Sequence, residues 1–179
     1  MTRMYLVKLG DLVVAHYGSA LKEADRRSSG RVPVFGSNGE VGRHDVALVD
    51  SPTIVIGRKG SVGAVTYAPH GGWPIDTTYY LEILHHDRVD LRYLFWALSR
   101  SGLDRRAITT SIPGLNRDEL YRTRIRLPTI PEQRRIAAML DKTDEIQRKR
   151  RESLRLLDDL LRSAYEDIAG ARNPAHDHG

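Results

Sequence analysis

The longest stretch without glycine or proline constrains this chain most, because it dictates the structure of the last third. Neither residue occurs between Glu132 and Ala169. Thr129 and Glu132 have the spacing of a capping box, and Pro131 suits a first helical turn. Gly170 marks the expected end. The pattern predicts a helix of roughly 37 residues, about 55 Å long, which is too long to pack fully on a small domain.

One apolar stripe follows this helix at alternating steps of four and three, which is the spacing of a coiled-coil seam. The stripe is apolar at both ends and polar in the middle. A seam of this length needs a partner, which favours half of a coiled coil over a lone helix lying across its own domain. The pattern leaves a parallel or antiparallel partner open, and the absence of an internal repeat places that partner on another chain. The predicted helix-pairing residues are Ile136, Leu140, Leu154, Leu157, Leu161 and Ile168.

The residues before this helix alternate glycine-rich turns with short β-prone runs. Helical spacing of leucines predicts one helix over residues 91–101, and Asn116 with Glu119 predicts the start of a second. The fold class is therefore α+β: a strand-rich domain over residues 1–128, a long helix over 129–169 and a flexible tail over 170–179. The predicted strands are Val32–Phe35, Thr53–Ile56, Gly63–Tyr67 and Thr77–Ile83, with turns at Asn38-Gly39 and Gly71-Gly72.

Charge is distributed unevenly along the chain. The formal net charge is +5. Residues 1–130 carry 18 Lys and Arg against 13 Asp and Glu, whereas residues 131–179 carry ten of each. This bias favours a polyanionic partner for the first region. The chain has no cysteine, which excludes disulfides and thiolate metal sites, and no apolar run of membrane-spanning length, so we expect a soluble, cytoplasmic protein.

The glycine-rich segment Gly57–Gly63 lies between two β-prone runs and carries Arg58, Lys59 and Ser61. Glycines allow a loop to approach a ligand closely, and adjacent cations with exposed amides suit a phosphate. The segment lacks the strand-to-helix context of nucleotide-binding loops. The alternative interpretation is a hairpin whose charges are merely solvated.

Two further loops carry polar side chains that suit nucleic acid. Ser37 and Asn38 can bond base edges or phosphates, although Asn-Gly is also a common hairpin turn. Ser111 and Arg117 flank the start of the predicted helix after Asn116, where backbone amides favour an anion. An N-cap without any ligand is the alternative there.

Signatures of catalysis and of metal binding are weak. Ser19 and Lys22 have the Ser-x-x-Lys spacing of one hydrolase class without its accompanying motifs. His85-His86 and the pair His176 and His178 lack a third ligand at a convincing spacing. The sequence therefore predicts neither an enzyme acting alone nor a metal site.

Taken in order, several segments resemble the specificity subunit of type I restriction-modification systems. The resemblance extends from residue 5 to about residue 168 and ends in a Pro-x-x-Glu-Gln motif before the long helix. The segments are Lys8–Asp11, Val32–Gly39, Ile56–Gly63, Trp73–Thr77, Ile112–Arg117 and Leu127–Ala137.

The resemblance implies a target-recognition domain that reads double-stranded DNA, followed by a spacer helix. A typical specificity subunit has two such domains and two helices, packed as an antiparallel coiled coil. It holds two adenine methyltransferase subunits, and restriction subunits join that core. S-adenosylmethionine, ATP and Mg are expected on those partners, and no cofactor on this chain.

This sequence departs from that layout because it contains one domain and one helix. It is similar to a half-subunit, and we expect it to pair with a second copy or with a different half-subunit. Alternative functions are recognition within another modification system, an RNA-binding adaptor using the Gly-x-x-Gly form of Gly57–Gly60, and an anti-restriction or purely structural coiled-coil protein. The predicted DNA-binding residues are Ser37, Asn38, Arg58, Lys59, Ser61, Ser111 and Arg117.

Overall fold

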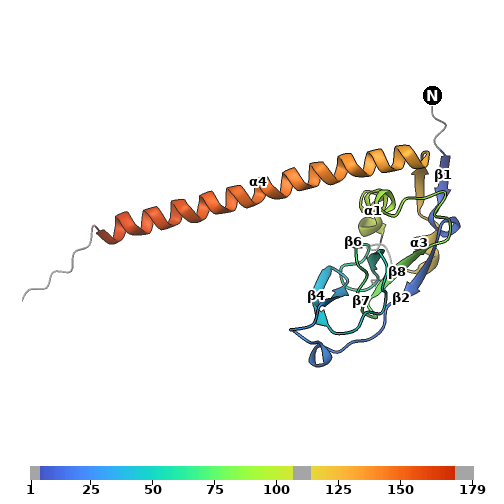
Figure 1. The fold of residues 1–179 in the computed structure, drawn as a ribbon, viewed down its shortest axis with the longest axis horizontal. Helices are drawn as coiled ribbons and strands as arrows, with labels where there is room; N and C mark the ends of the chain where they lie inside the picture. The colour runs from blue at the N-terminus through green and yellow to red at the C-terminus, as the bar shows by residue number, and fades with distance from the viewer. Residues whose placement is uncertain (1–4, 107–113, 172–179) are drawn as a thin grey trace, which may run out of the picture. The chain divides into compact units, whose positions relative to one another are not determined.

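The computed structural model describes residues 5–106 and 114–171, with side chains up to residue 166. The chain divides into two compact units, Met1–Ala137 and Ala138–Gly179. The described strands of Figure 1 are β1 (Tyr5–Lys8), β2 (Val13–Tyr17), β3 (Val32–Gly36), β4 (Gly39–His44), β5 (Thr53–Gly57), β6 (Val65–Ala68), β7 (Trp73–Pro74), β8 (Thr78–Ile83) and β9 (Arg124–Leu127). The described α-helices are α1 (Leu91–Ser99), α2 (Leu103–Arg106), α3 (Arg117–Tyr121) and α4 (Ile130–Ala171), and the 3-10 turns are η1 (Leu9–Asp11) and η2 (Glu23–Asp25).

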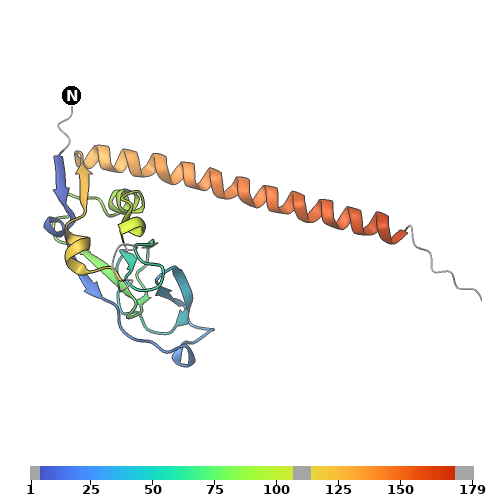
Figure 2. The same cartoon turned by 180° about the vertical axis from the view of Figure 1, so that it is seen from behind.

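The first unit contains a four-stranded antiparallel sheet in the order β2-β8-β5-β6. Figure 2 shows the chain from the side opposite to that of Figure 1. Every residue of β5 is buried, as expected for an apolar run at the middle of a sheet. Ile54, Ile56 and Leu81 from this sheet join the main hydrophobic core, and α1 packs against β5 and β6. Burying each such side chain stabilises the fold by about 1.5–3 kcal/mol.

The first unit also contains a three-stranded sheet in the order β4-β3-β7, in which β3 and β7 are parallel. Ser37 and Asn38 form the turn between β3 and β4, and Gly39 begins β4 with a φ of +108°. The predicted Asn38-Gly39 turn therefore lies one residue earlier. Gly71 and Gly72 also have positive φ, as their predicted turn requires.

A two-stranded sheet pairs the two ends of the first unit, because β1 is antiparallel to β9 with Tyr5 opposite Leu127. Sequence patterns did not predict either strand. The four predicted strands are observed within two residues of their expected ends as β3, β5, β6 and β8. The predicted α+β class, a strand-rich region followed by one long helix, is confirmed.

The start of α4 is held inside the first unit by one buried side chain. Gln133 is fully buried, and its Nε2 donates to the Arg88 carbonyl at 2.9 Å and the Pro128 carbonyl at 2.8 Å. Its Oε1 accepts from the Asp90 backbone N–H at 2.8 Å. Asp90 in turn caps α1, because its side chain accepts from the Tyr93 N–H. The glutamine of the Pro-x-x-Glu-Gln motif thus joins three segments of backbone.

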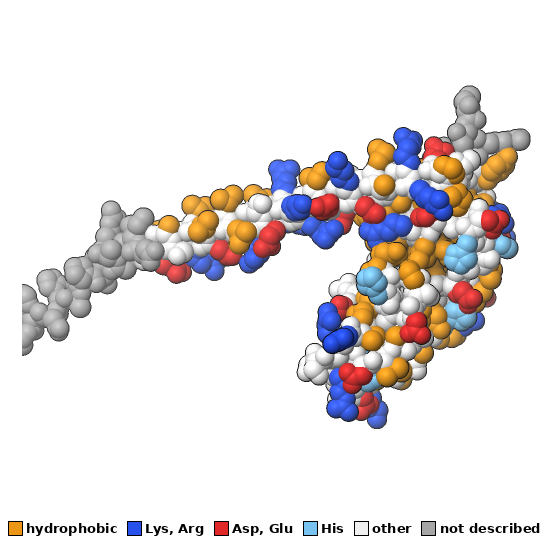
Figure 3. All heavy atoms as spheres, viewed as in Figure 1, with side chains coloured by type: hydrophobic (Ala, Val, Ile, Leu, Met, Phe, Trp, Pro, Cys, Tyr) orange, Lys and Arg blue, Asp and Glu red, His pale blue; other side chains and the backbone are white. Residues whose placement is uncertain are grey.

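Helix α4 has 42 residues, so it is longer than the sequence predicts and spans about 63 Å. Gly170 lies inside it and does not end it. Positive and negative side chains are interspersed along it (Figure 3), and Lys149 with Glu145 is one of its i,i+4 ion pairs. No helix of the described residues is long and apolar enough to cross a membrane.

Every described side chain from Arg151 to Glu166 is exposed. Leu154, Leu157 and Leu161 of the predicted seam are 53%, 54% and 68% exposed, and the side chain of Ile168 lies outside the described residues. Ile136 and Leu140, in the first turns of the seam, are half-buried. Leucines outside the seam are equally accessible, at Leu156 and Leu160. Pairing through this seam therefore stays a prediction.

Candidate nucleic-acid interface

The glycine-rich loop 57–63 joins β5 to β6, two antiparallel neighbours of the main sheet. Gly57 permits its tight closure: a Cβ there would lie 2.1 Å from the Ser61 carbonyl oxygen and 2.7 Å from that of Ser37. Gly60 has a φ of +75° with open space around it, whereas Gly63 lies against the backbone of Leu103. The glycines therefore shape a loop that packs on its neighbours and leaves its tip free.

The turn between β3 and β4 packs against this loop. The Ser37 hydroxyl donates a hydrogen bond of 3.0 Å to the Thr77 carbonyl. The backbone N–H groups of Arg58 and Lys59 donate to the same carbonyl at 2.8 and 3.1 Å. One oxygen before β8 therefore connects two of the loops that sequence analysis singled out.

A third predicted segment joins the same cluster through the backbone. The Leu115 N–H donates to the Arg58 carbonyl at 2.9 Å, and the Tyr79 hydroxyl donates to the Leu115 carbonyl at 3.1 Å. Arg117 follows as the first residue of α3, whose N-cap is Asn116. The Asn116 side chain accepts from the Asp118 N–H, so this helix start is capped by its own chain, as predicted.

Two guanidinium groups meet over one aromatic ring at the centre of this cluster. The Arg117 Cζ lies 4.3 Å from the ring centre of Tyr17, and the Arg58 Cζ lies 5.1 Å from it. Tyr17 ends β2 opposite Tyr79 of β8, with the ring centres 5.1 Å apart. Strand pairing therefore places the acceptor ring, and two separate loops bring the cations to it.

The charges of these two arginines are not neutralised within the described part of the chain. Neither forms an ion pair with a described carboxylate, and the Nε of each is buried without a hydrogen-bond partner there. Arg58 makes one side-chain bond, from a terminal nitrogen to the Asp76 carbonyl at 3.2 Å. Two adjacent cations without a counter-charge form an anion-binding arrangement.

The tyrosines respond to this environment in opposite directions. The Tyr79 side chain, followed by the charge and the hydrogen bond of Arg117 and by the charge of Arg58, lowers the pKa of Tyr17 below its ordinary value. Burial, together with Tyr17, raises the pKa of Tyr79 to about 12. Tyr79 is thus held neutral, and Tyr17 is the tyrosine whose proton is sensitive to the cations.

The predicted contact residues gather in this region, with one exception outside the described residues. Arg58 and Arg117 share the Tyr17 ring, and Ser37 packs beside the loop with its hydroxyl already donating within the chain. The side chains of Asn38, Lys59 and Ser61 are exposed at turn and loop positions. Ser111 lies outside the described residues. Sequence reasoning missed Tyr17 and Tyr79, because no spacing relates them to the loops.

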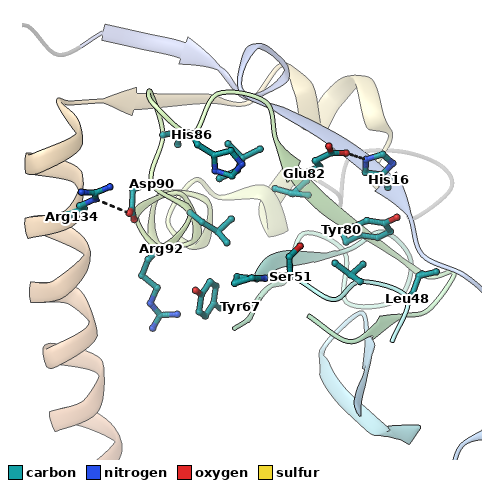
Figure 4. A pocket seen from close by; sticks show the side chains of 16 residues that line it. His16, Leu48, Ser51, Tyr67, Tyr80, Glu82, His86, Asp90, Arg92 and Arg134 are labelled. Atoms are coloured by element: carbon teal, nitrogen blue, oxygen red, sulfur yellow. Dashed lines mark hydrogen bonds and ion pairs between the residues drawn. The ribbon is translucent and has the colours of Figure 1, made fainter. Parts of the chain in front are cut away.

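A separate groove of about 780 Å³ lies on the other face of β2 and β8 (Figure 4). His16 and Tyr80 line it, and their neighbours Tyr17 and Tyr79 point to the opposite face because side chains alternate along a strand. His16 Nε2 lies 2.7 Å from a Glu82 oxygen, and Arg134 Nε lies 3.7 Å from one of Asp90. The groove therefore carries paired charges and is distinct from the arginine cluster.

Within the described residues, no group of three or more His, Cys, Asp or Glu side chains could hold a metal ion. His176 and His178 lie outside those residues. The expectation that cofactors bind only to partner subunits is untested by the structure and stays a prediction.

Solved structures share this fold. The S subunit of a type I restriction-modification system from M. genitalium matches with a TM-score of 0.71 and 23% identity, over 80% of this chain and 40% of that one. The HsdS subunit from Thermoanaerobacter tengcongensis matches with a TM-score of 0.58 and 19% identity, over 79% and 37%. A structure of type I system assembly and conformational transition matches with a TM-score of 0.62 and 20% identity, over 95% and 43%.

The chain therefore spans about two fifths of the length of these proteins, and the likeness shows the fold. No curated protein matches it. The family model described as the type I restriction modification DNA specificity domain matches residues 2–156, which is most of the chain. The description of that family favours DNA over RNA as the ligand. The chain belongs to the type I restriction-modification DNA specificity family, and its role is DNA sequence recognition without catalysis.

Proposed function

We propose that this chain directs the adenine methyltransferase subunits of a type I restriction-modification complex to their DNA target, with restriction subunits joining the same complex. The observation that carries the proposal is the arginine cluster on Tyr17, where Arg58 and Arg117 meet without a described counter-charge. A duplex supplies the missing anions as backbone phosphates. Family membership supports DNA as the ligand.

The loops around the cluster make two kinds of contact with DNA, to phosphates and to base edges. Arg58, Arg117 and the exposed Lys59 contact phosphates and set the register of the protein on the duplex. Asn38 and Ser61, which are exposed beside them, read base edges. Ser37 supports the turn that presents Asn38, because its hydroxyl is bonded to Thr77.

Pairing through α4 restores the two-domain layout from two copies of the chain. The exposed leucines at positions 154, 157 and 161 support this, since a free seam of that kind is stabilised by a partner helix. A symmetric pair has two identical recognition domains related by a two-fold axis. The DNA target then consists of two separated halves that are inverted copies of one another.

Methylation mapping tests the proposal directly. The chain is expressed with the methyltransferase subunit of the same system, and modified adenines are mapped genome-wide. The expected result is a split motif with inverted halves that disappears when this chain is omitted. An asymmetric split motif would preserve the specificity role and replace the second copy by a different half-subunit. No motif, with a methyltransferase shown to be active, would refute the proposal.

A variant without the two arginines tests whether methylation of the DNA motif depends on the arginine cluster. Arg58→Ala with Arg117→Ala is expected to abolish methylation of the motif, because two phosphate contacts are lost together. Arg155→Ala is the matched control: it also removes an arginine, but one already paired with Glu152 and Asp159. Unchanged methylation in the Arg58 and Arg117 variant would show that the cluster does not contact DNA.

A further inference from the structure

The two arginines of the cluster come from segments far apart in the chain, yet they share one ring. Arg58 belongs to the loop after β5 and Arg117 to the first position of α3. Like charges repel, so a structure that holds them together needs an attractive element between them. The ring of Tyr17 is the element that both arginines share, because the face of an aromatic ring attracts cations. Arg58 also lies 6.0 Å from the ring centre of Tyr79.

The position of Tyr17 is itself fixed by its backbone. It pairs with Tyr79 in the register of β2 with β8. The next residue, Gly18, donates its N–H to the Thr78 carbonyl, and a Cβ at Gly18 would lie 2.1 Å from the Ile75 carbonyl oxygen. The strand end is therefore pressed against the segment before β8. The ring nevertheless stays 50% exposed, so ligand can reach the arginines around it.

We propose that Tyr17 is the positioning residue of the DNA interface: its ring holds Arg58 and Arg117 side by side for the phosphate backbone of one DNA strand. This inference rests on the proposed function, because it assigns a role within the same interface. The orphaned Nε atoms of both arginines support it. Each guanidinium lies within cation–π distance of the ring, and one terminal nitrogen of Arg58 also donates to the Asp76 carbonyl. No described carboxylate competes with phosphate oxygens for either charge.

The hydroxyl of Tyr17 adds a pH dependence that an ordinary structural residue lacks. The groups that face it are Tyr79 from β8, Arg58 from the loop after β5 and Arg117 from α3. Deprotonation of Tyr17 places a negative charge between the arginines and weakens phosphate binding. Because its pKa is lowered, this occurs below pH 10, where Tyr79, with a pKa of about 12, stays neutral.

The test measures the affinity of the full chain for a labelled DNA duplex of arbitrary sequence, at several salt concentrations. Tyr17→Ala is expected to weaken binding about tenfold, the effect of losing two cation–π contacts. In the Arg58→Ala with Arg117→Ala background, the same change should cost less than about twofold, because the residues act as a unit. Tyr17→Phe, which keeps the ring, should recover most of the affinity lost in Tyr17→Ala.

The pH profile separates positioning from simple support of the fold. Between about pH 7 and pH 10 the wild-type affinity should fall about threefold more than that of Tyr17→Phe. Tyr5→Ala removes an exposed tyrosine from the β1–β9 sheet and serves as the control with unchanged binding.

The outcomes distinguish this inference from the function on which it rests. If wild type does not bind duplex DNA at all, the proposed function fails. If the arginine variants lose affinity and Tyr17→Ala does not, or if Tyr17→Ala is additive with them, the function stands and the positioning role is refuted. Parallel pH profiles of wild type and Tyr17→Phe would also overturn the role of the hydroxyl.

Discussion

The loop cluster and the second half of α4 are stabilised in opposite ways. Around Arg58, backbone groups from three distant segments bond one another, and Tyr79 is buried beneath them. Between Arg151 and Glu166, every described side chain is exposed and the ion pairs join residues three or four apart. The first region acquires its geometry from its own chain. The second presents exposed apolar side chains, whose burial by another molecule is a prediction.

Disrupting the predicted seam tests most directly whether the leucines of α4 pair with another chain. Leu157→Asp is expected to weaken self-association about a thousandfold, because a symmetric dimer loses two buried leucines, worth about 4 kcal/mol together. The stability of the first unit should be unchanged. Sedimentation equilibrium gives the dissociation constant, and urea unfolding gives the stability.

Leu156→Asp is the matched control, since Leu156 is 50% exposed against 54% for Leu157 but lies off the seam. It should leave association nearly intact. An equal loss in both variants would show that the pairing face is not the 4-3 stripe. A wild-type chain that stays monomeric at micromolar concentration would refute pairing of identical copies.

Gln133→Ala tests whether the start of α4 belongs to the first unit. The change leaves the Arg88 and Pro128 carbonyls and the Asp90 N–H without their partner, so unfolding free energy should fall by about 3 kcal/mol. Urea denaturation measures this loss. Arg135→Ala, two residues away and exposed, should alter stability by less than about 0.5 kcal/mol. Similar stabilities of the two variants would contradict the anchoring role.

The smallest expected effect concerns the ion pairs of α4. The hydrogen bond from Lys149 lowers the pKa of Glu145, and that from Arg155 lowers the pKa of Glu152. Their contribution is therefore complete above the ordinary pKa of 4.5 and is lost as pH falls through the lowered values. Ellipticity at 222 nm should decrease slightly on acidification, less so in Glu145→Gln with Glu152→Gln. Coincident acid profiles would show that these pairs contribute nothing.

Sequence patterns predicted the elements that are marked by uninterrupted runs of residues suited to one kind of structure. The long helix and strand β5 were predicted from uninterrupted runs of suitable residues. Strands β1 and β9 were missed, because β9 reads Arg-Ile-Arg-Leu over only four residues and its partner is more than a hundred positions away. Strand β4, with Gly39 and Gly42, has glycines that argue against a strand.

The candidate site also contains residues that the sequence predicted and residues that it did not. Glycines and adjacent charges pointed to the loop that carries Arg58, and the structure brings Arg117 beside it. Tyr17 was not predicted, because only the pairing of β2 with β8 places it between residues 41 and 100 positions away. Gln133 lay within a quoted motif without an assigned role, since the spacing of a motif does not show which backbone groups a side chain will satisfy.

From the bonds of Gln133 we expect α4 to begin forming at its first turn. Ordering the first turn of a helix in water is the unfavourable step, and each later residue adds at little cost. Since the side chain secures residues of that first turn against Arg88 and Pro128, the folded domain acts as a template for helix growth. We expect growth to proceed from this end toward the leucines, which would then become ordered last. If the predicted pairing takes place, we expect completion of the helix and choice of a partner to be coupled in one late event, at the end remote from the template.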